Sequence, residues 1–283
     1  MPQRKMCVIE MNRGENYIEM LTSSGYELQD RTVLDVGCEH GEVLMFFSKK
    51  SAETIGLDIN KDFLRIAKKK AKNSSQENFN ALVANGKHLP LKDECVDIVL
   101  MIGALEFVPL RDPYSEPKET HLEALKGIKR ILRKNGALLL GIENRYWIGF
   151  WFGIKDHHTG MRFITILPRR IANFIYKRKK GTPFYLERTY SYFELNEILT
   201  NAGFTIQKKF TALPSWGCNK EIPDIDNKSD FNQKIDSIET WKPFIYELYS
   251  ICLFPKVFWK ILNSLGLAKF FCSNLIYVSK KKT

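Results

Sequence analysis

The stretch VLDVGCEHGEVL, residues 33–44, constrains the fold of this chain more than any other part of its sequence. An apolar run leads into an acid and two glycines four residues apart, and a second apolar run follows. This pattern predicts a buried strand, a sharp turn and a helix that packs back on the strand. Parallel sheets are built from such units, and they bind ligands at the turn after the strand.

The same alternation continues through the first half of the chain. We predict strands at 32–37, 54–60, 79–85, 95–105 and 137–144, and helices at 41–50, 61–73 and 121–132. Asn135 and Gly136 end the last of these helices in a turn. Strands that alternate with helices form a parallel sheet with helices on both faces.

The second half of the chain completes this sheet and adds two insertions. Residues 191–204 predict a helix with Ser191 and Glu194 at capping-box spacing, 204–213 predict the sixth strand, and the C-terminal stretch predicts an antiparallel seventh. We therefore expect an α/β, doubly wound, seven-stranded Rossmann-like sheet with an α-rich cap. We expect the cofactor-binding core to span 1–144, with the core helix and sixth strand at 191–213 and the last strand with a basic tail at 273–283. The two cap insertions are expected at 145–190 and 214–272.

The turn after the first strand excludes two common ligands. A nucleoside triphosphate loop needs Gly-Lys-Ser/Thr at the helix start, whereas this helix starts with Gly41-Glu42. A dinucleotide loop places a diphosphate at the helix N-terminus, where acids such as Asp35 would repel it. Asp58 ends the second strand, where doubly wound nucleoside sites place a carboxylate for ribose hydroxyls. The expected ligand is a cationic nucleoside without phosphate, a description that S-adenosylmethionine fits.

Four segments, LDVGCEHG, GLDIN, ALVANGKHLPLKDECVDIVLMIGALEFV and RILRKNGALLLGIEN, together resemble a class I S-adenosylmethionine-dependent methyltransferase over about residues 30–145. The resemblance implies an enzyme with S-adenosyl-L-methionine as cofactor. It also implies a cofactor site formed by Asp35, Gly37 and Gly41 at the methionine end with Cys38 in the same loop, Asp58 at the ribose, Ile59, Asn85 and Gly86 at the adenine, and Ile102 and Gly103 at the end of the fourth strand.

Two positions depart from the family pattern. Glu39 stands where a glycine is usual, and we expect a non-glycine residue there to avoid positive φ and to hold the ligand further from the backbone. Its carboxylate is also placed to reach the ammonium of the methionine end. Asn85 stands where an Asp is common, and an Asn can still donate to and accept from an adenine edge. If Glu39 prevents cofactor binding, the alternative is a non-catalytic scaffold with the same fold.

Three residues are candidates for activating a methyl acceptor. Glu143 ends the fifth strand, and His157 and His158 lie in the first insertion. An acceptor hydroxyl needs an oriented base, and His or Glu is the usual choice. The alternatives are a solvated histidine pair and a strand-end acid that only accepts backbone donors. The other histidines are expected in structural positions, with His40 packed in the cofactor loop, His88 exposed in a turn and His121 on the surface at a helix start.

The composition limits the environment of the chain. Six cysteines show no pair at metal-ligand spacing, so we expect reduced thiols and no metal site. The N-terminal stretch has no apolar signal core, and no apolar run approaches the roughly 18 residues of a membrane span. We therefore expect a cytoplasmic protein.

The positive charge is concentrated in the second half. Residues 1–150 hold 22 basic and 21 acidic residues, whereas 151–283 hold 21 and 11. Residues 167–181 predict an amphipathic helix with Ile171, Phe174 and Ile175 on one face, flanked by Arg169, Arg170, Lys177, Arg178, Lys179 and Lys180, and 241–271 interleave aromatics with lysines. Such segments bind anionic membrane surfaces, so we expect peripheral docking on the inner membrane face. The alternative is a pair of ordinary cap helices with a solvated basic face.

The acceptor is suggested only by a second, weaker resemblance. IENR, DHHTG, ERTYSYFEL and ALPSW resemble a methyltransferase subgroup linked to surface-glycan or lipid-linked sugar biosynthesis. This implies a small-molecule, glycan or lipid-linked acceptor that is methylated at a hydroxyl. An RNA methyltransferase is the alternative, because basic residues among aromatics suit RNA. Against RNA, residues 102–105 lack the Asn/Asp-Pro-Pro-Tyr/Phe that enzymes acting on base amino groups carry after the fourth strand.

Overall fold

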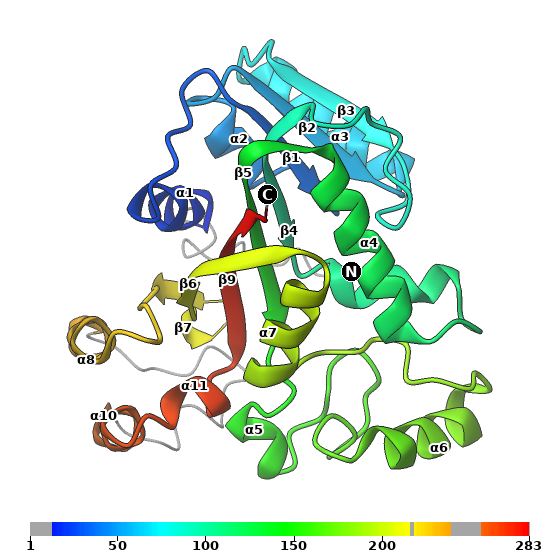
Figure 1. The fold of residues 1–283 in the computed structure, drawn as a ribbon, viewed down its shortest axis with the longest axis vertical. Coiled ribbons are helices and arrows are strands. Elements are labelled where there is room, and N and C mark those ends of the chain that lie inside the picture. The colour runs from blue at the N-terminus through cyan, green and yellow to red at the C-terminus, as the bar shows by residue number, and fades with distance from the viewer. Residues whose placement is uncertain (1–12, 216–217, 239–255, 283) are drawn as a thin grey trace.

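A seven-stranded sheet in the order β3-β2-β1-β4-β5-β9-β6 forms the centre of the molecule (Figure 1). The computed structural model describes residues 13–215, 218–238 and 256–282. The strands are β1 Thr32–Val36, β2 Glu53–Asp58, β3 Phe79–Val83, β4 Val96–Ile102, β5 Leu132–Glu143, β6 Phe204–Phe210 and β9 Asn274–Lys281. β9 runs antiparallel to both of its neighbours, β5 and β6, and the other neighbouring strands pair in parallel. The predicted fold class is confirmed.

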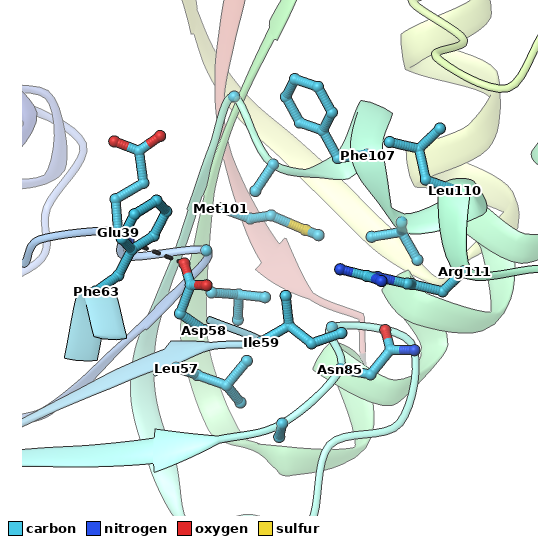
Figure 2. A pocket seen from close by; sticks show the side chains of 17 residues that line it. Glu39, Leu57, Asp58, Ile59, Phe63, Asn85, Met101, Phe107, Leu110 and Arg111 are labelled. Atoms are coloured by element: carbon cyan, nitrogen blue, oxygen red, sulfur yellow. Dashed lines mark hydrogen bonds between the residues drawn. The ribbon is translucent and has the colours of Figure 1, made fainter. Parts of the chain in front are cut away.

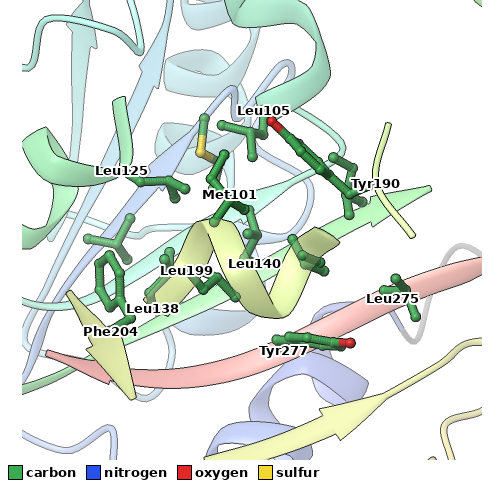
Figure 3. Close-up of a cluster of buried hydrophobic side chains, with 14 of the residues drawn as sticks. Met101, Leu105, Leu125, Leu138, Leu140, Tyr190, Leu199, Phe204, Leu275 and Tyr277 are labelled. Carbon is green, nitrogen blue, oxygen red and sulfur yellow. The ribbon is translucent and has the colours of Figure 1, made fainter. Parts of the chain in front are cut away.

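Helices cover both faces of the sheet. They are α1 Arg13–Ser23, α2 Leu44–Phe47 and α3 Lys61–Asn73 on one face, and α4 Pro117–Ile131 and α7 Tyr192–Asn201 on the other. Figure 3 shows the second layer, where Leu125 of α4 and Leu199 of α7 pack on Leu138 and Leu140 of β5. The intervening Leu139 belongs to the core of the opposite face. A central strand buried on both faces explains the unbroken apolar run of β5.

Most predicted bounds shift by a few residues, the strand expected at 95–105 ends at Ile102 before the 3₁₀ helix Leu105–Arg111, and two further differences have a clear local cause. The helix expected at 41–50 is only the four-residue α2, because Gly41 still belongs to the turn, with φ of +72°. β5 begins at Leu132, before the Asn135-Gly136 turn, because Leu132 pairs with Val96 ahead of a bulge. The capping box of α7 is confirmed: Glu194 N donates to Ser191 Oγ at 3.3 Å, and Ser191 N donates to Glu194 Oε2 at 2.9 Å.

His121 is buried, and its predicted surface position is wrong. α4 begins at Pro117 behind the capping residue Glu116, so His121 lies a full turn inside the helix and faces the core. Its Nδ1 lies 2.7 Å from the hydroxyl of Tyr190. Burial, with the charges of Arg188 and Arg169, lowers the pKa of His121 to about 3, so the imidazole is neutral. His88 is exposed, as predicted.

The first insertion carries α5 Ile148–Trp151 and α6 Arg169–Lys180 and has a small apolar core of its own. Arg145 joins it to the sheet domain. The guanidinium donates to the carbonyl oxygens of Thr165 and Leu167 at 3.0 and 2.7 Å and to Glu194 of α7 at 2.8 Å. This buried arginine therefore holds the loop before α6 against α7.

The three apolar residues predicted on one face of α6 do not share one environment. Ile171 and Phe174 are 48% and 57% exposed, whereas Ile175 is half-buried against the core of the insertion. Arg169 does not flank this surface. It turns inward, and burial lowers its pKa to about 10 even though Glu194 lies 3.6 Å away.

The second insertion contains β7 Leu213–Ser215, β8 Cys218–Glu221, α8 Lys228–Ser237, α10 Lys256–Ser264 and α11 Ala268–Phe271. In Figure 1, α5, α6, α10 and α11 lie at the same lower end of the molecule. The predicted aromatic segment 241–271 lies outside the described residues up to position 255. Within the described part of the chain, no helix is long and apolar enough to span a bilayer.

Candidate functional site

A cavity of about 420 Å³ lies at the carboxyl ends of β1, β2 and β4, where parallel sheets place their ligands (Figure 2). Its walls come from the turn after β1, from Asp58 and Ile59 at the end of β2, and from Asn85 and Gly86 after β3. The 3₁₀ helix η2, Leu105–Arg111, closes the opposite side with Phe107, Leu110 and Arg111. Figure 2 shows the side chain of Arg111 extending into the cavity.

A second cavity of about 200 Å³ adjoins the first around the same turn. Gly37, Glu39 and Gly103 line both cavities, and Arg13, Asp35, Cys38 and Ile102 line the second. All but one of the predicted cofactor residues therefore line one of these two cavities. The exception is Gly41, where a Cβ would lie 2.9 Å from that of Ala67, so this glycine lets the turn pack against α3.

The turn keeps its left-handed geometry even though Glu39 stands at a usual glycine position. Gly37 has φ of +81°, and a Cβ there would lie 2.6 Å from that of Ala104. Glu39 has φ of +47°, so the prediction that this residue avoids positive φ is wrong. Its backbone N–H donates to Asp58 Oδ2 at 3.0 Å, which ties the turn to β2. A left-handed non-glycine residue costs about 1–2 kcal/mol, which the chain tolerates here.

The Asp58 carboxylate is fixed by the backbone. Oδ2 accepts from Glu39 N, and Oδ1 accepts from Asn60 N at 2.8 Å. The side chain is mostly buried yet lines the larger cavity. The Asn85 side chain is also oriented, because its Oδ1 accepts from Lys87 N at 3.0 Å. The carboxylate thus presents its remaining lone pairs to the cavity, and the Asn85 amide has donors left for a ligand.

The smaller cavity pairs a buried acid with a basic group that the sequence analysis missed. Arg13 precedes the recognisable motif by twenty residues, and only the packing of α1 brings it beside Asp35. Its Nε is buried and has no hydrogen-bond partner among the residues that the structure describes. Burial, with the charges of Asp35 and Asp58, raises the pKa of the Cys38 thiol, which is therefore neutral rather than a nucleophilic thiolate. A ligand with a carboxylate and an ammonium matches Arg13 and Asp35.

Asp35 gives the site a pH dependence. Burial, then the charges of Asp58 and Glu39, raises its pKa from 3.8 to about 7, while Arg13 opposes the shift. Because the folded state holds this proton more tightly than the unfolded chain, ionisation of Asp35 costs stability as pH rises from about 4 to about 7. We expect the free energy of unfolding of the wild type to fall between pH 5 and 8 relative to Asp35→Asn, measured by urea unfolding. Parallel curves for the two proteins would contradict this.

Three predicted catalytic candidates, Glu143 and the adjacent pair His157 and His158, meet beside the larger cavity. His157 Nδ1 lies 3.3 Å from Glu143 Oε1, and His158 Nε2 lies 3.4 Å from Glu143 Oε2. The centroids of the two imidazole rings lie 4.0 Å apart. Phe107 lines the cavity, and its ring centroid lies 5.0 Å from that of His158. The structure therefore places this cluster just behind the cavity wall.

The titratable side chains of this cluster shift one another's pKa values. Burial alone would lower the pKa of His158, but the Glu143 carboxylate outweighs burial and raises it to about 9. The neighbouring Glu106 in η2 is fully buried, and burial raises its pKa to about 7, with Glu143 adding to the shift and His158 opposing it. Glu106 follows β4 in η2, and it packs next to the cluster rather than lining the cavity.

Asp156 orients the loop that carries both histidines, and the sequence analysis missed it. Its Oδ1 accepts from His158 N at 3.4 Å, and its Oδ2 accepts from Thr159 N and Oγ1 at 3.2 and 2.5 Å and from the Tyr185 hydroxyl at 3.0 Å. An aspartate two or three residues before its backbone donors is a turn signal. The contact with Tyr185 depends on tertiary packing.

Part of this chain is similar to known methyltransferase sequences. Residues 34–140 match the family model described as a methyltransferase domain. An uncharacterised protein of Methanocaldococcus jannaschii is 32% identical over 145 residues, which cover 46% of this chain and 55% of that protein. The demethylmenaquinone methyltransferase of Lactococcus lactis is 28% identical over 116 residues, 40% of this chain and 42% of the relative. The chain spans about half the length of the curated relatives it matches.

The fold is shared with solved methyltransferases. A SAM-dependent methyltransferase from Methanosarcina mazei aligns with a TM-score of 0.55 and 17% identity, over 93% of this chain and 97% of that one. The family match agrees with the predicted enzyme class and with S-adenosylmethionine as the expected cofactor. Residues 34–140 therefore match a methyltransferase domain, and the seven-stranded sheet has the fold of the solved SAM-dependent methyltransferase.

Proposed function

We propose that this chain transfers the methyl group of S-adenosylmethionine to a hydroxyl of a small-molecule, glycan or lipid-linked acceptor. One observation carries the proposal: a cavity with a backbone-fixed acid at one end adjoins, across Phe107, a carboxylate–imidazole cluster. The acid suits the nucleoside, and the cluster suits the acceptor.

Each part of the cofactor has partners in the two cavities. Asp58 accepts from the ribose hydroxyls, and Ile59, Asn85 and Gly86 contact the adenine. In the smaller cavity, Arg13 pairs with the carboxylate of the methionine moiety and Asp35 with its ammonium. Such charged hydrogen bonds contribute about 1.5–3 kcal/mol each.

The acceptor half is in-line displacement at the sulfonium methyl. The acceptor oxygen forms a bond to the methyl carbon while the carbon–sulfur bond breaks, and its electron pair stays on sulfur, which becomes a neutral thioether. The hydroxyl proton leaves through the cluster of Glu143, His157 and His158. The rest of the rate enhancement comes from positioning, because a well-oriented pair of reactants gains several kcal/mol.

The direct test measures binding and transfer separately. Calorimetric titration with S-adenosylhomocysteine tests the cofactor site, and we expect micromolar affinity. Acceptor-dependent formation of S-adenosylhomocysteine is then measured with lipid-linked sugars, free glycans and structured RNA. Transfer to a hydroxyl acceptor supports the proposal. Cofactor binding with transfer to RNA alone would replace it with the RNA-methyltransferase alternative, and absence of binding would favour a non-catalytic scaffold.

We also propose that α6 docks on the inner face of an anionic membrane, which would place the enzyme in the cytoplasm and bring a lipid-linked acceptor within reach. Ile171 and Phe174 project from the helix. Arg170 and Lys177–Lys180 are exposed around them, and the guanidinium of Arg178 lies over the Phe174 ring at 4.5 Å. Exposed apolar side chains ringed by basic ones characterise interfacial helices.

Double replacement of Ile171 and Phe174 by serine is expected to abolish co-flotation with anionic vesicles. Burial of the exposed halves of these side chains contributes roughly 2 kcal/mol, or about thirtyfold in partitioning. Vesicles of phosphatidylcholine and phosphatidylglycerol at low salt are the test, and Tyr114→Ser, which changes an exposed aromatic on another surface, is the control. Wild-type protein that fails to float with these vesicles would end the proposal.

A further inference from the structure

The cluster beside the cavity has the composition and spacing of a metal site. Ligand atoms of Glu143, Asp156, His157 and His158 all lie within 4.8 Å of one another, the one such group among the described residues. Two ligands held about 2.1 Å from a tetrahedral zinc ion lie roughly 3.4 Å apart. The two nitrogen–oxygen separations to Glu143, 3.3 and 3.4 Å, have this value.

The hydrogen bonding of the cluster is incomplete. Nε2 of His158 and Oε2 of Glu143 are both buried and lie 3.4 Å apart, and among the described residues neither makes a hydrogen bond of regular geometry. The His158 side chain is only 4% exposed, and its Nε2 points at the Glu143 carboxylate without the geometry of a hydrogen bond. Buried polar atoms are rarely left unsatisfied, and a bound ion is one reason why they are found so.

Asp156 positions the ligands rather than binding the ion. Its carboxylate already accepts four hydrogen bonds, from the backbone of the histidine loop, from Thr159 and from Tyr185. It therefore fixes the loop so that both imidazoles face Glu143. His157 is 53% exposed on its side chain, so the cluster is open to solvent on one side. A metal held there would keep coordination positions for an external ligand, as catalytic sites do.

We infer that Glu143, His157 and His158 form a binding site for a divalent transition-metal ion. Two imidazoles and a carboxylate suit zinc, manganese or iron better than magnesium, which prefers oxygen ligands. The site departs from the sequence-based expectation of no metal, which rested on cysteine spacing. Its role rests on the proposed function: an ion held there would bind the acceptor oxygen and lower the pKa of its hydroxyl, so that the proton, which the metal-free cluster would accept directly, would pass to water instead.

The test is metal binding by the full chain, independent of catalysis. Protein freed of metal with a chelator is titrated with Co²⁺, whose visible absorption reports nitrogen and oxygen ligands, and with Zn²⁺ by calorimetry. We expect one equivalent bound, and at least a 100-fold loss of affinity in the His157→Ala/His158→Ala double variant. Glu143→Gln, which keeps the side-chain shape, is expected to weaken binding as well. His88→Ala, at an exposed histidine outside the cluster, is the matched control.

Each outcome separates this inference from the proposed function. Wild-type protein that binds no stoichiometric metal, or that binds it no more tightly than the double variant does, overturns the metal site. S-adenosylhomocysteine affinity is measured on the same proteins, and we expect it unchanged in the double variant, which also reports folding. Metal binding without methyl transfer would keep the site and remove the proposed function, whereas methyl transfer by protein that binds no metal would do the reverse.

Discussion

Replacement of Asp58 by alanine is expected to weaken S-adenosylhomocysteine binding by about 10²–10⁴-fold. The carboxylate lines the larger cavity and is aimed by two backbone donors, so it would meet both ribose hydroxyls without rearrangement. Two hydrogen bonds to a charged group contribute about 3–6 kcal/mol together, and each 1.4 kcal/mol is tenfold in affinity. Calorimetry on the purified variant measures the loss.

Two further variants keep this experiment specific. Asp58→Asn retains the shape and one acceptor for the backbone, so it separates lost charge from a collapsed turn. Asp62→Ala removes an exposed acid four residues away that pairs with Arg65 on the surface of α3. Its affinity should equal that of the wild type. If Asp58→Ala binds within threefold of the wild type, the ribose lies elsewhere and the cofactor assignment fails.

Replacement of Arg145 by methionine is expected to lower the free energy of unfolding by about 3–5 kcal/mol. The guanidinium is 4% exposed and holds two carbonyl oxygens of the first insertion and the Glu194 carboxylate. Removal of one member of a buried ion pair leaves the other charge uncompensated, which costs this amount. The midpoint of urea unfolding measures the effect.

The control uses an ion pair of the same charge type on the surface. Lys118 and Glu197 pair at 2.6 Å, but both are exposed, so Lys118→Met should change stability by less than about 1 kcal/mol. Arg145→Lys should recover little, because a lysine cannot donate to three acceptors in the same plane. Equal losses of unfolding free energy in Arg145→Met and Lys118→Met would show that Arg145 does not hold the first insertion against α7.

The sheet domain and the first insertion supply different parts of the candidate site. Residues before position 112 line both cavities, whereas the first insertion supplies the two histidines behind Phe107. A shared core that carries different insertions explains how one fold serves many acceptors. The described part of the second insertion adds no lining residue to either cavity.

Local patterns were sufficient for most of the fold. The approximate positions of β1 to β5, α3 and α4 follow from apolar periodicity, and α7 follows from its capping box, because these signals act between residues close in sequence. The cavity position then follows from the parallel sheet, since the carboxyl ends of its strands meet at one edge. The amino-acid sequence is therefore enough to assign Asp35, Asp58 and Asn85 to one edge of the sheet, where they line the two adjoining cavities.

Features that depend on packing between distant segments could not be predicted in this way. His121 looked exposed because its burial depends on Tyr190, 69 residues away. Glu39 looked unable to adopt positive φ because its turn is fixed by a hydrogen bond that Glu39 N donates to the carboxylate of Asp58 on the neighbouring strand. Arg13 carries no motif, and only the packing of α1 beside the turn places it in the wall of the smaller cavity.

The sequence by itself determined the alternation of strands and helices from β1 to β5, the turn beside the candidate cofactor cavity and the acids around it, because short-range periodicity and strand-end position encode them. Tertiary structure alone decided that Glu143 meets His157 and His158. That meeting requires the insertion to fold back on the end of β5, and the contacts that hold it there, Arg145 to Glu194 and Asp156 to Tyr185, join residues 49 and 29 positions apart. No local pattern specifies interactions over such separations, since they form only when the packed chain excludes the alternatives.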